Sequence, residues 1–191
     1  MRYQADHKAR TRRRILKNAA RRLRAEGLNG PGVAKLMKAS GLTVGGFYKH
    51  FRNKEDLLTE AVEEGFSEFG ERVFATLEKL PPADRWKAMV RWYLSPEHCE
   101  HPDHGCPIAA LAPEIARAAP AVRKKVASLM KARRARMLKF MPGATAPEKE
   151  KNFNTIFTSM AGAVAVARIF PDPRERDHLL NSVRDHLLES F

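Results

Sequence analysis

The densest group of chemically reactive side chains lies near the middle of the chain. Nine consecutive residues hold three His, two Cys and two acids: His98, Cys99, Glu100, His101, Asp103, His104 and Cys106. Imidazole, thiolate and carboxylate groups are the usual ligands of zinc and similar ions. Structural zinc sites, however, draw on regularly spaced ligand pairs, and this segment has neither a Cys-x-x-Cys pair nor a second cluster downstream. We therefore expect no metal and no cofactor.

Cys106 allows a second hypothesis, a redox or electrophile sensor. It precedes a predicted helix and lies near His104, and both features lower the pKa of a thiol. The favoured alternative is a buried cysteine that packs as a small apolar residue. A thiol- or metal-dependent enzyme is the remaining option, but no catalytic triad, phosphate-binding glycine loop or carboxylate pair is recognisable. We predict that the protein is not an enzyme.

The positive charge of the chain is concentrated at its N-terminal end. Residues 1–57 contain 15 Lys or Arg and 4 Asp or Glu, whereas residues 58–191 contain 20 and 18. A basic module joined to a nearly neutral body is typical of proteins that bind a polyanion, above all the phosphate backbone of nucleic acid. A basic surface kept only for solubility is the alternative, but it does not predict this asymmetry.

The composition is that of an ordinary globular protein, with 43% hydrophobic and 30% charged residues. No apolar run reaches the roughly 18 to 20 residues of a membrane-spanning helix. The N-terminal residues are polar and basic and lack the apolar core of a secretory signal. We therefore expect a cytoplasmic protein without a membrane partner.

Apolar residues recur at three- and four-residue spacing, which predicts an all-α protein of about nine helices. The first helix is expected to start at about Asp6 or Thr11 and to stop at Gly27. Pro31 should begin a second helix that ends near Ala39. The third helix is expected over residues 43–51, and the fourth from Asn53 to the prolines at 81–82. A fifth helix should carry its apolar face between residues 86 and 94, before a polar loop at 95–105. Two helices are expected over 106–117 and 120–140, an eighth after the loop at 142–147 with its apolar stripe between 153 and 164, and a ninth after the prolines at 171–173.

The second and third of these helices form a candidate helix-turn-helix. Gly41 lies in the short turn between them and can adopt the positive φ that such a turn requires. Five apolar residues would form the core of this unit: Leu23, Leu36, Leu42, Phe47 and Phe51. The third helix would then be free to enter the major groove of DNA.

Two consecutive segments carry a resemblance to the TetR family of transcriptional regulators. They are Gly-Leu-Thr-Val-Gly-Gly-Phe-Tyr-Lys-His-Phe at 41–51 and Asn-Lys-Glu-Asp-Leu-Leu at 53–58. The resemblance implies a helix-turn-helix DNA-binding domain over 1–55 and an effector-binding and dimerisation domain over 56–191. It further implies a repressor that binds a palindromic operator in double-stranded DNA as a homodimer and is released by a small-molecule effector. An architectural protein that coats DNA without operator preference remains the alternative.

The resemblance also assigns roles to single residues. DNA contacts fall on Thr43, Val44 and Gly45 at the start of the recognition helix. Tyr48 and His50 are phosphate contacts, Lys49 is a further cationic contact, and Lys54 lies at the N-terminus of the next helix. Tyr48 could instead only pack its ring, and His50 could be a surface histidine without a role. Gly32 and Met37 depart from the family pattern, so a phosphate contact is expected to be missing and the helix spacing to be altered.

Residues of the C-terminal half are assigned in the same way. The helices that line the effector pocket in the family supply six candidates: Trp86, Met89, Tyr93, Phe153, Phe157 and Met160. Plain core is the alternative for each of them. The small residues 161–163 would let another helix approach closely, and with the leucines of the last helix they form the predicted dimer interface.

Overall fold

The computed structural model describes residues 2–191, and their side chains from His7 onward. These residues form nine α-helices and three short 3-10 helices and contain no β-strand, so the all-α prediction is confirmed. The helices are α1 (Arg2–Glu26), α2 (Val33–Ala39), η1 (Val44–Lys49), α3 (Lys54–Leu77), η2 (Pro82–Asp84), α4 (Arg85–Tyr93), α5 (Pro96–Glu100), α6 (Pro107–Ala116), α7 (Pro120–Met137), η3 (Leu138–Phe140), α8 (Ala146–Ala167) and α9 (Pro173–Ser190).

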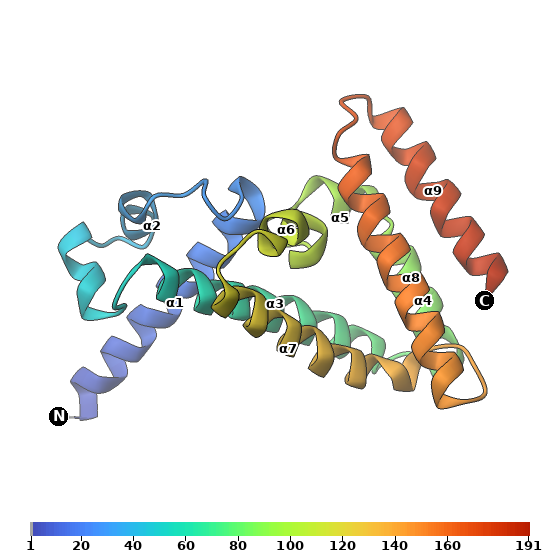
Figure 1. Ribbon diagram of the computed structural model, residues 1–191, viewed down its shortest axis with the longest axis horizontal. Coiled ribbons are helices and arrows are strands. Elements are labelled where there is room, and N and C mark those ends of the chain that lie inside the picture. Colours follow the sequence, from blue (N-terminus) through green and yellow to red (C-terminus); the bar gives the residue numbers. More distant parts are fainter. Residues whose placement is uncertain (1) are drawn as a thin grey trace.

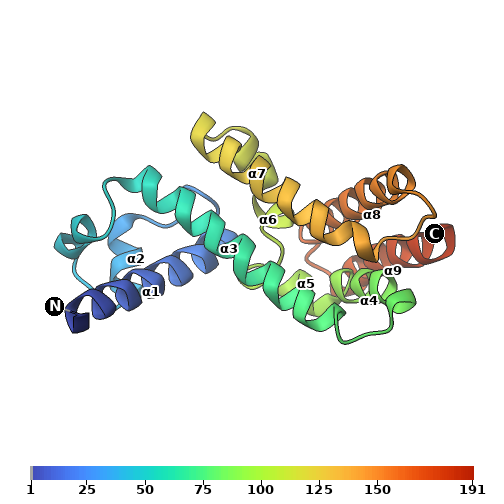
Figure 2. The ribbon, with the colours of Figure 1, turned by 90° about the horizontal axis from the view of Figure 1, so that it is seen from below.

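The helices are arranged as a head and a body joined by a long helix (Figure 1). The head consists of α1, α2 and η1, and α3 begins there and extends into the body, where α7 packs along it. The far end of the body holds α4, α8 and α9, with α9 packed against α8. The view from below shows α3 connecting the two parts (Figure 2). No helix in residues 2–191 has the length and apolar character that a membrane span requires.

Local signals explain the turns of the head. Gly27, with φ of 85°, ends α1, and Gly41, with φ of 68°, forms the turn after α2, as predicted. Both are left-handed conformations that glycine adopts without steric cost. Asn53 caps α3 because its side-chain oxygen accepts a 2.8 Å hydrogen bond from the Asp56 amide, which satisfies one of the unpaired donors at the helix start.

Several predicted boundaries were wrong. The helix α1 begins at Arg2 rather than at Asp6 or Thr11. The helix α2 begins at Val33 rather than Pro31. The third helix is a six-residue 3-10 helix from Val44 to Lys49, and the Thr43 side chain makes no capping hydrogen bond. Its two glycines at 45 and 46 disfavour a regular α-helix. The predicted polar loop contains α5, which starts where Ser95 Oγ accepts a hydrogen bond from the His98 amide.

The hydrophobic core is divided between the head and the body, and α3 contributes to both parts. Its N-terminal half packs with Ile15, Leu36 and Phe51 of the head, and its C-terminal half packs with α4 and α8. The core of the head also takes in four residues from α6 and α7: Leu111, Ile115, Val122 and Val126. The head is therefore not packed as a separate unit, and the boundary at residue 55 stays a prediction.

Candidate DNA interface and ligand cavity

The segment 43–49 presents its polar face to solvent. Phe47 and Phe51 are each only 2% exposed, and their rings pack in the core of the head. On the opposite face Val44 is 51% exposed and Tyr48 is 76% exposed. Thr43, Gly45 and Lys49 are exposed as well. The buried phenylalanines thus fix the segment to the core and leave the predicted DNA contacts uncovered.

His50 and Lys54 lie at the two ends of the loop that follows. His50 is half-buried, and its carbonyl accepts a 3.3 Å hydrogen bond from Arg12 Nε. Its Nδ1 atom is buried and has no hydrogen-bond partner among the described residues. Burial lowers the pKa of His50, and the nearby cations Lys8, Arg12 and Lys49 lower it further. Lys54 is exposed at the first position of α3.

The two residues that depart from the family pattern lie in α2. Gly32 is the N-cap of α2 and has no side chain, so it offers no hydroxyl for a phosphate contact. Met37 is fully buried, and its Cε atom would lie 3.7 Å from a Cβ atom added at Gly46. Met37 thus fills the space beneath the recognition segment with ordinary van der Waals contact.

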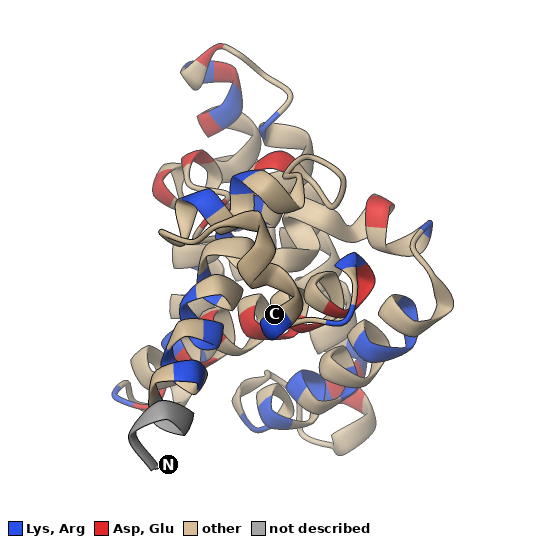
Figure 3. Cartoon of the chain, turned by 90° about the vertical axis from the view of Figure 1, so that its left-hand side faces the viewer, with Lys and Arg blue, Asp and Glu red and all other residues tan. Residues whose placement is uncertain are grey.

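A band of cations runs along the outer face of α1. A shallow groove on this face is lined by Arg10, Arg13, Arg14, Lys17, Asn18 and Arg21. Asn18 Nδ2 donates to the Ala39 carbonyl and to Ser40 Oγ, both at 3.2 Å, so the groove adjoins the helix-turn-helix corner. Figure 3 shows Lys and Arg following one another along α1. This face adds positive charge beside the recognition segment.

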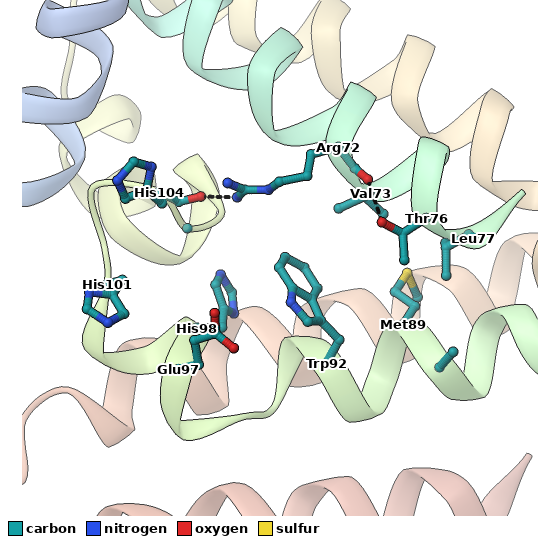
Figure 4. Close-up of a pocket in the computed structure, with 12 residues that line it drawn as sticks. Arg72, Val73, Thr76, Leu77, Met89, Trp92, Glu97, His98, His101 and His104 are labelled. Atoms are coloured by element: carbon teal, nitrogen blue, oxygen red, sulfur yellow. Dashed lines mark hydrogen bonds between the residues drawn. The ribbon is translucent and has the colours of Figure 1, made fainter. Parts of the chain in front are cut away.

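The body contains a cavity of about 390 Å³ between α3, α4 and the loop from α5 to α6 (Figure 4). It is lined by Arg72, Val73, Thr76, Leu77, Ala88, Met89, Trp92, Glu97, His98, His101, His104 and Gly105. The apolar residues lie at the end formed by α3 and α4, where Thr76 also lies, and the histidines lie toward the loop. A volume of this size suits a small organic ligand.

The predicted effector residues are divided among three places. Met89 lines this cavity. Phe153 and Phe157 are stacked on each other and line a separate cavity of about 150 Å³. Trp86, Tyr93 and Met160 are buried in the core of the body and line neither cavity. Trp92 was not predicted, although its position three residues after Met89 places both on one face of α4.

His98 is buried beside the cavity with both ring nitrogens engaged. The Cys106 amide donates to His98 Nε2 at 2.9 Å, so this nitrogen carries no proton. His98 Nδ1 therefore carries the proton and donates to the Tyr93 carbonyl at 2.7 Å. Burial lowers the pKa of His98 to about 4, although the bond to Tyr93 opposes the shift. The neutral ring, stacked on Trp92 with centroids 5.1 Å apart, ties the loop to α4.

The cluster at 98–106 thus has a structural explanation. Both cysteines are free and 2% exposed, and burial raises the pKa of Cys99. Cys106 lines the smaller cavity at the start of α6. Within residues 2–191 no three His, Cys, Asp or Glu side chains are placed to hold a metal ion.

Arg24 connects this loop to the head. Its side chain is 1% exposed, and Nε donates to the Asp103 carbonyl at 2.7 Å. The two other nitrogens donate to the Gly65 carbonyl at 3.2 Å and to Glu68 Oε2 at 3.1 Å, both on α3. Burial lowers the pKa of Arg24, and Glu68 opposes this shift. The role of Arg24 was not predicted, since nothing in a basic helix marks one arginine as buried.

Two further contacts link the body to neighbouring elements of the fold. Arg72 of α3 donates to the His104 carbonyl in the same loop. Glu114 of α6 accepts a 2.6 Å hydrogen bond from the Leu28 amide, directly after α1. The wall of the cavity is therefore bonded to α1 and α3, and α6 is bonded to the turn that leads into α2.

The surface formed by α8 and α9 carries an uncovered apolar groove. It is lined by Ser159, Gly162, Ala163, Val166, Leu179, Ser182, Val183, His186 and Leu187. Val166 is 45% exposed, and Ile169, just beyond α8, is 75% exposed. A Cβ atom added at Gly162 would meet nothing within 4 Å. The predicted dimer face is thus exposed in the single chain.

Comparisons with known proteins agree with these features. Residues 15–61 match the family model described as bacterial regulatory proteins, tetR family. The HTH-type transcriptional regulator AcrR of Shigella flexneri is 35% identical over 71 residues, which are 37% of this chain and 33% of that protein. The chain therefore matches about a third of the length of this curated relative.

Solved structures extend the similarity to almost the whole chain. A TetR transcriptional regulator from Chloroflexus aurantiacus is 26% identical, covers 95% of this chain and 94% of its own, and has a TM-score of 0.78. A protein from Saccharomonospora viridis, solved in complex with choline, shares the fold at 17% identity and a TM-score of 0.70, with 93% of this chain and 95% of that chain covered. Residues 15–61 thus match the tetR family of bacterial regulatory proteins, and the chain shares its fold with a TetR transcriptional regulator over almost its whole length.

Proposed function

We propose that the protein is a ligand-responsive repressor that binds a palindromic operator as a homodimer and is released by a small-molecule effector. The predicted contacts to DNA are Thr43, Val44, Gly45, Tyr48, Lys49, His50 and Lys54. The exposed residues of the recognition segment would meet base edges and phosphates, and the cations of α1 would add attraction to the backbone. Such a protein would act in the cytoplasm.

The observation that carries the proposal is the bonding of the cavity wall to the head through Arg24. This buried side chain joins the loop at Asp103 to α1 and α3 at the same time. A ligand that displaces the loop would break or shift these bonds, because their geometry leaves little freedom in a buried site. The change would reach α1, which packs directly on the helix-turn-helix unit.

The choline complex of the Saccharomonospora viridis protein supports an effector site in this fold, since that protein holds a small organic molecule. In the present chain we assign the effector to the 390 Å³ cavity. The predicted residues Phe153 and Phe157 would then belong to a second, smaller space, where Cys106 could also be reached by a small reagent.

The dimer is proposed to form through α8 and α9. Pairing of two copies would cover Val166 and the groove around Gly162, and burial of such apolar surface stabilises association. Val166→Asp would place a charge in this contact, so we expect light scattering to give half the wild-type mass. A wild-type mass for this variant, or a monomeric wild-type protein, would contradict the assignment.

The operator can be identified by selecting bound duplexes from a random pool at near-physiological salt. We expect a palindrome whose half-sites lie about one helical turn, roughly 34 to 36 Å, apart, because two recognition segments of a dimer must reach successive major grooves. Recovery of duplexes without a common sequence would favour the architectural alternative, in which the protein coats DNA without reading it.

A further inference from the structure

The polar groups that line the cavity are mostly engaged with the protein itself. His98 uses both ring nitrogens, and Thr76 Oγ1 donates to the Arg72 carbonyl at 3.0 Å. His104 Nε2 lies 3.1 Å from Asp103 Oδ2. These groups therefore offer a ligand few free hydrogen-bonding sites, which leaves His101 and the charged side chains as the main determinants of its head group.

Arg72 is the cation of the cavity. Its guanidinium crosses from α3 toward the loop, where one nitrogen donates to the His104 carbonyl (Figure 4). It lies 6.0 Å from the ring centre of Trp92 and forms no ion pair with a carboxylate in the described part of the chain. Guanidinium carries five N–H donors in a fork that matches a carboxylate, so donors remain for a ligand.

The electrostatic surroundings of this end of the cavity are positive. The charges that lower the pKa of His98 beyond its burial are Arg168 and Arg72. The nearby carboxylate Glu68 is bonded to Arg24 and Arg21, and Asp103 faces His104. Glu97 is the remaining carboxylate of the lining, and it is exposed on the first turn of α5. A negative group would therefore be favoured beside Arg72 rather than at the rim beside Glu97.

The opposite end of the cavity requires an apolar body. Val73, Leu77, Ala88 and Met89 present hydrocarbon and thioether groups there, and Trp92 separates them from the loop. Burial of an alkyl or aromatic group against these residues removes apolar surface from water. We propose that the cavity takes an amphipathic organic anion, whose carboxylate is bound by Arg72 and whose apolar part lies against α3 and α4. This inference rests on the proposed effector site and names its ligand class.

The ligand class can be tested on the purified protein without DNA. Trp86→Phe leaves Trp92 as the sole tryptophan, because the chain contains two, and its emission then reports on the cavity. The probes are decanoate, decylamine and decanol, which share one chain length and differ in head group, each used below its micelle-forming concentration. We expect decanoate to bind at least about tenfold more tightly than decylamine.

Substitutions then assign this preference to Arg72. Arg72→Gln should abolish the advantage of decanoate over decanol, Arg72→Lys should keep part of it, and Glu97→Gln should leave it intact or increase it. Arg91→Gln is the matched control, since Arg91 lies on α4 outside the lining. Equal binding of decylamine, no binding of decanoate, or a preference that survives Arg72→Gln would overturn the proposal. Operator binding is measured separately, so decanoate that binds without releasing DNA would refute the effector response and leave the ligand class standing.

Discussion

The head and the body are both helical, but the outer face of α1 in the head differs from α7 in the body in what its cations contact. On α7 of the body, basic residues pair with carboxylates of α3: Lys125 with Glu63 at 2.8 Å and Arg136 with Glu71 at 2.5 Å. Arg134 of α7 pairs with Glu150 of α8, and Lys139 of η3 pairs with Glu78. Four arginines of α1 also pair with carboxylates: Arg12, Arg21, Arg22 and Arg24. Arg13, Arg14 and Lys17, on the outer face of the same helix, form no ion pair within the described residues.

This difference has a functional meaning. A cation already paired within the protein contributes little to the field around the molecule, whereas an unpaired one attracts phosphate and releases counterions from DNA. The charge of Arg13, Arg14 and Lys17 is thus accessible, and it lies beside the recognition segment. The body keeps its surface nearly neutral and contains the cavity and the apolar face of α8 and α9.

The largest effect is expected where the two regions are joined. Arg24→Met should lower the free energy of unfolding by about 3 kcal/mol, because it removes the donor to the Asp103 carbonyl, the added hydrogen bond to the buried Gly65 carbonyl and the main cation of Glu68. Urea unfolding measures the change. Arg22→Met is the control, since Arg22 pairs with Glu26 at the surface and should change stability by less than about 0.5 kcal/mol. Equal effects of the two variants would show that head and body are not coupled through Arg24.

In the body, a change of pH is expected to alter the free energy of unfolding by nearly as much. The pKa of His98 is lowered to about 4 in the fold from about 6.5 in the unfolded chain, so the unfolded state binds more protons between these values. The contribution of neutral His98 to the free energy of unfolding is complete above the pKa of the unfolded chain. It is lost, by up to about 3 kcal/mol, as pH falls from the unfolded pKa to the folded one. His98→Gln should remove this part of the pH dependence. Parallel stability profiles of the two proteins would exclude a buried neutral His98.

A smaller effect is expected at the turn of the head. Gly41→Ala should destabilise the protein by about 1 kcal/mol, because φ of 68° is unfavourable for an L-residue although a Cβ atom would meet nothing within 4 Å. Gly45→Ala, in the same unit with equal space, should be neutral or stabilising by a few tenths of a kcal/mol. Thermal unfolding compares the pair. A cost that is the same at both positions would point to packing rather than backbone conformation.

The smallest effect on stability is expected at the recognition segment. Lys49→Gln should leave the free energy of unfolding within about 0.5 kcal/mol of wild type, since the side chain is exposed. It should reduce the slope of log affinity for DNA against log salt by about 0.9 for each phosphate that the lysine neutralises in the wild-type complex. Lys79→Gln, an exposed position near the end of α3 in the body, should leave the slope unchanged. An unchanged slope for Lys49→Gln would remove this residue from the interface.

Local signals allowed much of the fold to be predicted from the sequence. Gly27, Gly41 and Asn53 mark helix ends through backbone conformation and capping, which depend on neighbouring residues alone. Periodicity likewise located the long helices, and the alternation of Phe47 and Tyr48 between core and solvent followed from it. The exposed recognition segment was therefore predictable.

The body site was less predictable because it depends on contacts between distant residues. No local pattern indicates that Arg24 is buried or that it reaches a carbonyl at Asp103, 79 positions away. The reactive cluster at 98–106 was visible, but its role as a hydrogen-bonded loop depends on how His98 meets Tyr93 and Cys106. Of the two helices that supplied the predicted effector residues, only α4 lines this cavity, and α3 was not among them. The effector role of Met89 therefore stays a prediction.

The sequence specificity of DNA binding by the head is measured directly as a ratio of two affinities. They are the affinity for the selected duplex and that for a scrambled duplex of equal length, at the same near-physiological salt. We predict a ratio of at least about a thousand for the wild type. Tyr48→Ala combined with Lys49→Gln should weaken operator binding while the protein stays folded. Equal affinities of the wild type for the two duplexes would contradict the conclusion that the segment 43–49 reads DNA sequence.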